Sequence, residues 1–532
     1  MDFELVIVGM GPVGAVAANL AGRHGLRTLV LEKAIAVHDK PRALGFDHEV
    51  MRIFGNIGIA GAIAPFVMPY RPSMYQTTGG QVIRRIDAEQ APHPLGWAPN
   101  YVFVQPEIEG ALRRNLEKFS CASVELGSEV NEVVNDEQGV LVTIRDSSGA
   151  VRQVRAGNVL ACDGGTSPIR TRLGLSMEDL AFDEPWLVVD VKLREGAGAS
   201  LPATNVQYCE TQRPCTFVVG PGQYRRWEFM INPDEVPADV ARPESVARLL
   251  SRWLAPDEYE IWRASTYRFH ALLLRTWRAG GIFFLGDAAH MTPPFLAQGM
   301  CQGIRDAANL VWKLALVRRG LADPGLLDTY QGERAPHVRQ TTLVAKEFGK
   351  SICERDPGRA ASRDEELLAA MARQPGGTVR QSLIPGLSGG FLSAQASAAR
   401  GSLFPQPAVR LATGETGLLD DFTGAGFRIV SSDDVDISVV AQCLGEHPWA
   451  QALSIRLVQL GPGARQDSGP RMRCEDVSGV LSGWMKAHGC GLVIARPDHY
   501  VYGMASTTAG ALALVRELLA GLGHSMAVAA AA

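Results

Sequence analysis

The sequence predicts an α/β protein: a nucleotide-binding domain of the Rossmann type, a β-rich segment inserted into it, and a separate β/α segment towards the C-terminus. Three observations predict this. A strand, a glycine-rich turn, a helix and a second strand open the chain at residues 3–32. A second strand–loop–helix pattern occupies residues 283–315, and the stretch from about residue 186 to residue 270 is β-rich. A chain of 532 residues is long enough for two or three such domains.

Composition and charge exclude several classes of protein. The hydrophobic share of 46% and charged share of 20% are those of an ordinary globular protein. A net charge of −4 gives no basis for binding nucleic acid or an anionic membrane. The apolar stretch near the N-terminus is interrupted by Gly and Pro, unlike a signal or membrane helix. Nine cysteines without a C-x-x-C spacing indicate reduced thiols and no metal site, so a cytoplasmic protein is expected.

The opening turn has the G-x-G-x-x-G spacing of a dinucleotide-binding site, at Gly9, Gly11 and Gly14. The first glycine allows the tight bend, the second lets a pyrophosphate approach the backbone, and the third lets helix and strand pack closely. Glu32 closes the second strand, where its carboxylate can accept hydrogen bonds from ribose hydroxyls. The spacing alone is common, but here strand, helix and acid are all in place. Because a carboxylate disfavours a 2′-phosphate, FAD or NAD is expected rather than NADP.

The second strand–loop–helix pattern separates FAD from NAD. Asp287 follows a strand through Gly286, which places its carboxylate at a strand end, where the polyol chain of a flavin is a suitable partner. The loop then leads into a helix that starts near Gly299. The free N–H groups and positive dipole end of that helix would stabilise the negative charge of a reduced flavin. NAD has no polyol chain, so the two loops are interpreted as holding opposite ends of one FAD.

In these motifs the sequence resembles the FAD-dependent aromatic hydroxylases, the single-component group A flavoprotein monooxygenases. Three motifs stand in the family's order: the glycine turn, a "DG" motif written CDGGTSPIR, and a "GD" motif written GDAAHMTPPFLAQG. The segments PRALG at residues 41–45 and VQPEIEGAL around Gln105 support them. The stretches RRWEFM, TYRFHALL and GSLFPQP look like the branch that contains 3-(3-hydroxyphenyl)propionate hydroxylase and phenol hydroxylase.

The resemblance implies a Rossmann-like FAD-binding domain with an inserted β-sheet substrate domain and a C-terminal thioredoxin-like domain. The FAD-binding domain is expected in two parts, residues 1–180 and 276–350, with the substrate domain at residues 181–275 between them. A helical and linker segment at residues 351–407 precedes the thioredoxin-like domain at residues 408–532. That domain lacks redox cysteines in this branch, and its presence is compatible with a homodimer.

The resemblance also assigns residues to the cofactor, from the glycine turn, the acid after it, the two supporting segments and the DG and GD motifs. The expected cofactor-binding residues are Gly9, Gly11, Gly14, Glu32, Arg42, Gln105, Asp163, Gly286, Asp287, Pro294, Gly299 and Met300. The carboxylate of Asp287 is expected at the ribityl chain, and the amides of Gly299 and Met300 at the N1–C2=O edge of the flavin. Asp163 belongs to a motif associated with both FAD and NAD(P)H.

The family's chemistry implies a NAD(P)H-dependent monooxygenase. NADH or NADPH reduces FAD, the reduced flavin takes up O₂ as a C4a-hydroperoxide, and one oxygen atom is transferred to a phenolic ring. The expected substrate is a phenolic acid like 3-hydroxyphenylpropionate, hydroxylated ortho to its hydroxyl group to a catechol, as in aromatic hydrocarbon catabolism. Alternatives are a larger polycyclic or polyketide aromatic substrate, a flavin reductase that does not oxygenate, and a flavin-bearing module without turnover.

Four residues are candidates for the substrate side. Asp47 and His48 follow PRALG, and one of them is either the acceptor of the phenol proton or only a helix cap at the surface. Tyr267 is a candidate hydrogen-bond partner of the phenol. Arg225 and Arg226 are adjacent on a strand and face opposite sides. The inward one, taken as Arg226, either binds a substrate carboxylate or forms an ion pair beneath the sheet.

Two residues of the DG and GD motifs have open roles. Arg170 is either a further cofactor contact or only the salt-bridging support of the DG motif. His290 has the chemistry of a base, but in this family the position is structural, so a supporting role is expected.

Overall fold

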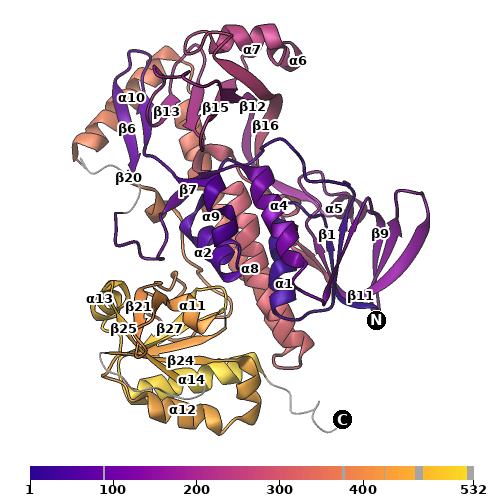
Figure 1. The fold of residues 1–532 in the computed structure, drawn as a ribbon, viewed down its shortest axis with the longest axis vertical. Helices are drawn as coiled ribbons and strands as arrows, with labels where there is room; N and C mark the ends of the chain where they lie inside the picture. The colour runs from indigo at the N-terminus through magenta and orange to yellow at the C-terminus, as the bar shows by residue number, and fades with distance from the viewer. Residues whose placement is uncertain (88–89, 374–377, 425, 462–470, 524–532) are drawn as a thin grey trace.

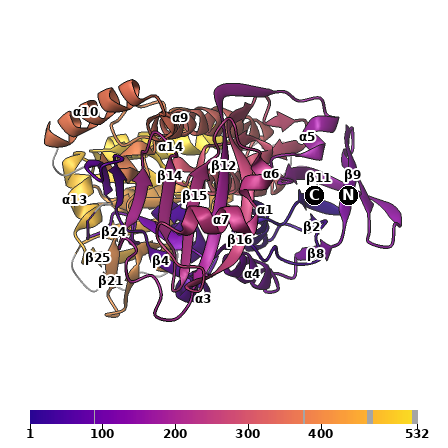
Figure 2. The same ribbon diagram turned by 90° about the horizontal axis from the view of Figure 1, so that it is seen from above.

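The computed structural model describes residues 1–87, 90–373, 378–424, 426–461 and 471–523. The chain forms three regions, with a second sheet above the first in Figure 1 and the C-terminal region, in orange and yellow, below both. Helix α8 (Gly299–Arg318) runs between the first sheet and the C-terminal region. From above, helix α10 (Pro357–Arg373) and strand β9 (Glu129–Asp136) lie at opposite ends of the molecule (Figure 2).

The first sheet is the predicted nucleotide-binding sheet. Five of its strands are parallel, in the order β8-β2-β1-β11-β18, and a hairpin of β9 and β10 extends it through β11. The central strands are continuous apolar runs because helices or loops cover both faces. Helix α1 packs against both α4 and α8. The bounds are β1 (Phe3–Val8), β2 (Thr28–Glu32), β8 (Ala122–Leu126), β10 (Gly139–Arg145), β11 (Val151–Ala161), β17 (Arg278–Ala279), β18 (Ile282–Phe284), α1 (Pro12–Arg23), α4 (Gln105–Leu116) and α5 (Pro168–Arg172).

The second sheet has nine strands among the described residues, in the order β19-β16-β12-β15-β14-β13-β5-β6-β20. The expected insertion at residues 181–275 supplies β13 to β16 and most of β12, but β5, β6, β19 and β20 come from outside it. Their pairing depends on long-range contacts, such as the parallel pairing of β5 with β13, which no local pattern reveals. The bounds are β5 (Ser73–Gln76), β6 (Val82–Asp87), β12 (Met177–Leu193), β13 (Asn205–Tyr208), β14 (Cys215–Val219), β15 (Tyr224–Met230), β16 (Tyr259–Leu274), β19 (His290–Met291) and β20 (Thr378–Val379).

The two faces of the second sheet differ in composition. On β15, Trp227 and Phe229 belong to an apolar core that α7 covers, and this is the outer face. Arg226 and Glu228 alternate with them and project from the inner face, towards the first region. Helix α9 packs on part of this inner face through Phe348. The helices are α6 (Pro237–Val240), α7 (Pro243–Leu250) and α9 (Thr329–Cys353).

A small three-stranded sheet links the first two regions. Strand β7 pairs antiparallel with both β3 and β4, and α2 starts directly after β3. The strands and helices are β3 (Gly45–Asp47), β4 (Val67–Pro69), β7 (Asn100–Phe103), α2 (His48–Asn56) and α3 (Ala60–Ile63). Short 3₁₀ turns are η1 (Ala64–Phe66), η2 (Gly286–Ala288), η3 (Pro294–Leu296), η4 (Pro324–Asp328), η5 (Arg380–Leu383) and η6 (Pro448–Leu453).

The C-terminal region has a seven-stranded sheet among its described residues, in the order β22-β21-β25-β24-β23-β26-β27. Helices α12 and α14 pack together in its core, and Trp312 of α8 joins that core through Phe391 and Phe427. The bounds are β21 (Ala408–Leu411), β22 (Thr416–Leu418), β23 (Arg428–Ser431), β24 (Arg456–Leu460), β25 (Arg471–Asp476), β26 (Leu492–Ala495), β27 (Val501–Ala505), α11 (Leu419–Thr423), α12 (Ile437–Gly445), α13 (Val480–Ala487) and α14 (Thr508–Leu522).

Two general expectations concern membranes and cysteines. Within the described ranges, no helix combines the length and the apolar character needed to cross a bilayer. All nine cysteines are free thiols, and most are buried. Burial raises the pKa of the Cys209 and Cys301 thiols well above the ordinary value, so they pack as apolar groups.

Candidate active site

The opening turn joins β1 to α1 with the geometry that its glycines allow. Gly9 has φ +97°, and a Cβ there would lie 2.3 Å from the Cys162 carbonyl oxygen. A Cβ on Gly14 would lie 1.9 Å from the Gly9 oxygen, so α1 packs directly on the turn. A Cβ on Gly11, the N-cap of α1, would meet no protein atom within 4 Å. The turn is therefore closed by protein at Gly9 and Gly14 and open at Gly11, where α1 presents its N-terminus.

Glu32 ends β2 beside this turn. Its Oε2 accepts a hydrogen bond from the Met10 N–H at 2.7 Å, and its Oε1 accepts one from the Ala34 N–H at 2.8 Å. An ionised carboxylate has about four acceptor positions, so capacity remains for ribose hydroxyls. The same carboxylate also fixes the backbone of the turn.

The GD loop places Asp287 between buried neighbours while its own side chain is exposed. Protein packed on its other sides still desolvates the carboxylate and raises its pKa, which the charges of His290 and Arg42 partly offset. Asp306 of α8 holds the loop: its Oδ2 accepts hydrogen bonds from the Gly286 N–H at 3.0 Å and from His290 Nε2 at 2.7 Å. The loop thus presents a carboxylate to solvent from a rigid base.

Asp306 and His290 are both fully buried. The second oxygen of Asp306 accepts a hydrogen bond from Arg334 Nε at 2.8 Å. Burial alone would raise the pKa of Asp306, but His290 and Arg334 hold it below the ordinary value. His290 therefore supports the loop through Asp306, in agreement with the structural role expected from the sequence.

Helix α8 begins at Gly299 beside this loop. Gln298 is its N-cap residue but provides no side-chain cap, so the first N–H groups of the helix lack an intrahelical partner. A Cβ on Gly299 would meet only the Thr292 oxygen, at 3.9 Å, so the backbone is accessible there. Ala297 precedes the helix with φ +54° and packs against Gly45 of β3. The helix N-terminus therefore lies next to the end of PRALG.

Pro294 and Met300 flank this start on either side. Pro294 begins the 3₁₀ turn η3, and Met300 is the second residue of α8. Both are half-buried. These positions do not test the predicted contacts of Pro294 and of the Met300 amide with the cofactor, so both contacts remain proposals.

The DG motif lies against the same loop. Asp163 accepts a hydrogen bond from the Ile169 N–H at 3.2 Å through Oδ2, while its buried Oδ1 has no hydrogen-bond partner among the described residues. Desolvation raises the pKa of this carboxyl. Arg170 donates hydrogen bonds to the carbonyl oxygens of Ala288 and Gly165, at 2.9 and 2.6 Å. Arg170 thus ties the DG motif to the GD loop, which favours the supporting role of the two considered.

Gln105 has a different task from the predicted contact. Its Oε1 accepts hydrogen bonds from the N–H groups of Arg42 and Ala43, at 2.8 and 2.6 Å, and its Nε2 donates to Glu109 at 2.6 Å. The side chain is buried and fixes the backbone of PRALG, so we assign it to positioning. Arg42 itself is exposed, and its charge partly offsets the raised pKa of Asp287, so the predicted contact of Arg42 with the cofactor remains a proposal.

Asp47 is the N-cap of α2 and lies in the interior. Its Oδ1 accepts a hydrogen bond from the Val50 N–H at 3.2 Å, and its Oδ2 accepts hydrogen bonds from Arg305 and, at 3.1 Å, from Gln298. Burial opposes ionisation, but Arg305 holds the pKa of Asp47 below the ordinary value. Of the two roles expected for Asp47, the structure shows the helix cap. This cap is buried and ion-paired, whereas the sequence predicted a cap at the surface.

His48, the next residue, is buried, and its Nδ1 has no hydrogen-bond partner among the described residues. Burial lowers the pKa of His48 from 6.5 to about 4; Asp47 opposes this, and Arg305, Arg52 and His93 reinforce it. The imidazole is therefore neutral near neutral pH and remains a candidate acceptor on chemical grounds.

The shifted pKa of His48 predicts a pH dependence of stability. Since the folded pKa is below the unfolded one, the stabilisation is fully present above pH 6.5 and is lost as the pH falls towards 4. At pH 5 the loss amounts to about 2 kcal/mol. Urea unfolding at pH 7.5 and pH 5 should show that His48→Gln loses less stability on acidification than the wild type. Equal losses would mean that His48 is accessible to protons when folded.

Arg226 is engaged by the protein itself. It forms a two-pronged ion pair with Asp190, at 2.5 and 3.1 Å, and donates a hydrogen bond to the Arg42 carbonyl oxygen at 2.9 Å. Both partners of the ion pair are buried. Arg263 approaches Asp190 to 3.7 Å and donates to the Pro41 carbonyl oxygen. Of the two roles considered for Arg226, the structure therefore shows the ion pair beneath the sheet. Arg226 and Arg263 also hold the backbone of PRALG from the inner face of the sheet.

Tyr267 and Glu228 share this inner face. The Arg263 guanidinium lies 4.8 Å from the centroid of the half-buried Tyr267 ring. Glu228 follows Arg226 at the next inward position of β15, and its carboxylate comes only to 3.7 Å from Arg226. One step further along the sheet, Trp186 packs against Phe295 of the loop before α8, with 5.9 Å between ring centroids. Glu228 therefore lies between the two points at which the inner face meets the cofactor-side loops.

Sequence reasoning missed several residues that organise the site. Arg305 and Asp306 are adjacent buried charges in helix α8, whose buried residues are mostly apolar but also include Gln302, Asn309 and Lys313. Adjacent opposite charges in a mostly apolar helix are a signal in the sequence that could have marked them. Asp190 had a similar signal, as one acid within the apolar run LVVDVKL of β12. Glu228 lies two residues after Arg226 in the stretch RRWEFM, and the alternation of a strand could have marked it as a second inward residue.

The residues present fit an extended dinucleotide with a polyol between its halves. The open backbone at Gly11 accommodates a pyrophosphate, and the remaining acceptor sites of Glu32 suit ribose hydroxyls. The unpaired buried oxygen of Asp163 and the exposed carboxylate of Asp287 lie on adjoining loops. Within the described part of the chain, no group of three or more His, Cys, Asp or Glu is placed to hold a metal ion.

Comparison with family models gives two matches. A model described as an FAD binding domain matches residues 2–345. A model described as the HcaD C-terminal domain matches residues 401–520.

Comparison with individual proteins gives full-length relatives. A probable NADH-specific resorcinol 4-hydroxylase of Rhodococcus jostii is 35% identical, covering 97% of this chain and 94% of the relative. A 3-(3-hydroxy-phenyl)propionate/3-hydroxycinnamic acid hydroxylase of Burkholderia vietnamiensis is 33% identical over 98% of both chains. The crystal structure of the flavin-dependent monooxygenase PieE with FAD and substrate matches with a TM-score of 0.83 at 20% identity, over 99% of this chain and 100% of that one. That similarity bears out the predicted fold class.

Proposed function

This chain belongs to the FAD-binding aromatic hydroxylases, the group A flavoprotein monooxygenases, and on that basis we propose that it uses NADH to hydroxylate a single-ring phenol with a second substituent meta to the hydroxyl group. The enzyme class and the FAD cofactor follow from the family. NADH and the phenol are the proposal. It is supported by the full-length similarity to two hydroxylases whose names specify such phenols, one of which is called NADH-specific.

The two relatives differ in that second substituent. Resorcinol carries a neutral hydroxyl, whereas 3-hydroxyphenylpropionate carries a carboxylate. The family resemblance of the sequence favoured the acid, and Arg226 was one of two open possibilities: a partner for the substrate carboxylate or an ion pair beneath the sheet. On the inner face, however, Arg226 and Arg263 are balanced by Asp190 and Glu228, so a buried substrate carboxylate would lack a free counter-charge. This balance favours a neutral diphenol such as resorcinol.

On the cofactor side, the chain's residues bind and orient FAD. The open turn at Gly11 would hold the pyrophosphate, Asp287 the polyol chain, and the N-terminus of α8 the edge of the flavin that becomes negative on reduction. Bound FAD supplies hydride acceptance from NADH and the activation of O₂ for transfer of one oxygen atom. The clamp on PRALG, from Gln105 on one side and Arg226 on the other, fixes the backbone that carries Arg42.

On the substrate side, the inner face binds the phenol and excludes water. The rings of Trp186, Phe269 and Phe295 pack together, with centroids 5.7 to 6.1 Å apart, and form an apolar wall. Beside it, the Glu228 carboxylate is placed to accept a hydrogen bond from a hydroxyl group of the substrate. Withdrawal of that proton towards Glu228 would raise the electron density of the ring for oxygen transfer.

Replacement of this acceptor tests the assignment. Glu228→Gln should lower kcat/KM for the phenol about 10-fold or more, because a charge-assisted hydrogen bond contributes about 1.5–3 kcal/mol. FAD content should stay unchanged, since Glu228 does not contact the cofactor loops. The matched control is Glu260→Gln, an exposed glutamate of β16 in the same sheet. An unchanged kcat/KM in Glu228→Gln would remove this residue from the substrate site.

The experiment for the proposed function is a substrate screen with the purified holoenzyme. Resorcinol, 3-hydroxyphenylpropionate and a polycyclic phenol are compared for acceleration of NADH and NADPH oxidation, with mass spectrometry of the products. We expect resorcinol to accelerate NADH oxidation most and to gain one oxygen atom. A product only from the phenolic acid or the polycyclic phenol would overturn the neutral-diphenol assignment. NADH oxidation that yields only peroxide with every phenol would overturn the hydroxylase function.

A further inference from the structure

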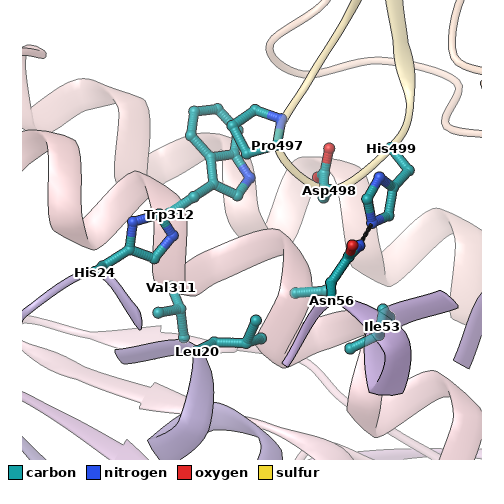
Figure 3. A pocket seen from close by; sticks show the side chains of 10 residues that line it. Leu20, His24, Ile53, Asn56, Val311, Trp312, Pro497, Asp498 and His499 are labelled. Carbon is teal, nitrogen blue, oxygen red and sulfur yellow. Dashed lines mark hydrogen bonds between the residues drawn. The ribbon is translucent and has the colours of Figure 1, made fainter. Parts of the chain in front are cut away.

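The loop between β26 and β27, residues 496–500 of sequence RPDHY, connects the C-terminal region to the first region. It inserts side chains between helices α2, α8 and α9. Asp498 accepts a hydrogen bond from Asn309 of α8 at 3.1 Å, and Asn56 of α2 contacts His499 at 2.6 Å. Figure 3 shows Pro497, Asp498 and His499 above residues of α2 and α8, around a crevice of about 30 Å³. The crevice holds at most about one water molecule, so the contact is close.

Tyr500, at the end of this loop, contacts helix α2. Its hydroxyl group donates a hydrogen bond to Glu49 Oε1 at 3.0 Å. The other oxygen of Glu49 accepts a hydrogen bond from Arg305 Nε at 2.5 Å. All three side chains are at least 97% buried. A residue of the C-terminal region thus fixes one prong of a guanidinium inside helix α8.

The remaining prongs of Arg305 hold the N-caps of two helices. Arg305 Nη1 donates to Oε1 of Gln298, the N-cap residue of α8, at 2.8 Å. Its Nη2 donates to Asp47, the N-cap of α2. Gln298 and Asp47 also bond to each other at 3.1 Å. The position of the free N–H groups at Gly299 therefore depends on Arg305 and, through Glu49, on Tyr500.

We propose that Tyr500 is a positioning residue for the flavin: through Glu49 and Arg305, the C-terminal region sets the N-terminus of α8 against the cofactor. This inference rests on the proposed function only in that FAD binds between Gly11 and α8. It gives the C-terminal region a part in the flavin site through Glu49 and Arg305, by hydrogen bonds that end on Gln298 and Asp47.

The charges of the cluster support this assignment. Asp47 and Glu49 share one guanidinium, so the hydrogen bond from Tyr500 stabilises the second carboxylate. Burial raises the pKa of Glu49 above the ordinary value, although Arg305 opposes this shift. Without the hydroxyl group, Glu49 would lose a donor in a buried place, and Arg305 would shift towards a new balance between Asp47 and Glu49.

The test compares two hydroxyl deletions in neighbouring residues. Tyr500→Phe removes the donor to Glu49, whereas Tyr502→Phe removes a buried hydroxyl from β27 that makes no contact with this cluster. The readouts are the reduction potential of bound FAD, its absorbance spectrum and the thermal unfolding midpoint. A purely structural role would lower the unfolding midpoint without moving the potential.

For Tyr500→Phe we expect the affinity for reduced FAD, relative to the affinity for oxidised FAD, to fall about threefold or more. This change would be measured as a more negative reduction potential of the bound FAD. Glu49→Gln, which removes one negative charge from the cluster, should shift the potential in the opposite direction. Tyr502→Phe should leave both spectrum and potential unchanged. Equal potentials in Tyr500→Phe, Tyr502→Phe and wild type would overturn the proposal. Failure of the hydroxylase assay alone would not, since flavin binding and potential are measured without a phenol.

Discussion

Gly11→Ala is expected to weaken FAD binding strongly while the apoprotein stays folded. A Cβ at this position meets no protein atom within 4 Å and φ lies in the ordinary range, so the substitution introduces no strain into the apoprotein. The added methyl group would occupy the space through which a pyrophosphate approaches the N-terminus of α1. We expect a loss of about 3 kcal/mol in binding, or roughly 100-fold in FAD affinity. Titration of the apoprotein with FAD, followed by fluorescence, measures it.

Two other glycines are controls. Gly61→Ala also adds a methyl group to open space, in α3 away from the turn, and should leave FAD affinity unchanged. Gly14→Ala should instead destabilise the apoprotein, because its Cβ would lie 1.9 Å from the Gly9 oxygen. Tight FAD binding by Gly11→Ala would show that the pyrophosphate does not pass over this turn.

Glu333→Ala is expected to give the largest loss of stability. Glu333 is a buried acid of α9 that accepts hydrogen bonds from Arg496, Lys313 and Asn309, at 2.6 to 3.1 Å. Burial alone would raise the pKa of Glu333, but the cations Arg496 and Lys313 hold it far below its ordinary value. Its removal leaves two buried cations without a full counter-charge, which destabilises by about 3–5 kcal/mol. The midpoint of urea unfolding at pH 7.5 measures this loss.

A surface acid of the same helix provides the comparison. Glu347 is exposed and forms an ion pair with the exposed Lys350, so Glu347→Ala should change the unfolding midpoint little. The pKa of Glu333 is lower in the folded state, so its stabilisation is present above the unfolded pKa and falls on acidification. Similar midpoints for Glu333→Ala and Glu347→Ala would mean that the cations find other partners or water.

The parts of the site that depend on local sequence could be predicted. The turn at Gly9 to Gly14 and the start of α8 at Gly299 are set by residues within a few positions of each other, so their spacing reveals them. The alternation on β15 likewise predicted that Arg225 and Arg226 face opposite sides and that one of them faces inward, and the structure shows that this one is Arg226. The family resemblance added the order of these motifs along the chain.

The partners of these residues could not be predicted, because they are distant in sequence. The ion pair of Arg226 with Asp190 depends on the register between β12 and β15. Tyr500 and Glu49 are separated by 451 positions, and neither lies in a motif. A carboxylate such as Asp47 has the chemistry of an acceptor in any context, and only the fold shows that Arg305 already engages it.

The central claim is that two distant loops hold opposite ends of one FAD, and binding of the two halves of FAD tests it most directly. Calorimetry would measure the affinities of ADP and of riboflavin for the apoproteins of wild type, Gly11→Ala and Asp287→Ala. We predict that Gly11→Ala weakens only the binding of ADP and that Asp287→Ala weakens only the binding of riboflavin. FAD should displace both from the wild type. The account would be contradicted if both variants lost affinity for the same half of FAD, or if FAD failed to displace ADP or riboflavin from the wild type.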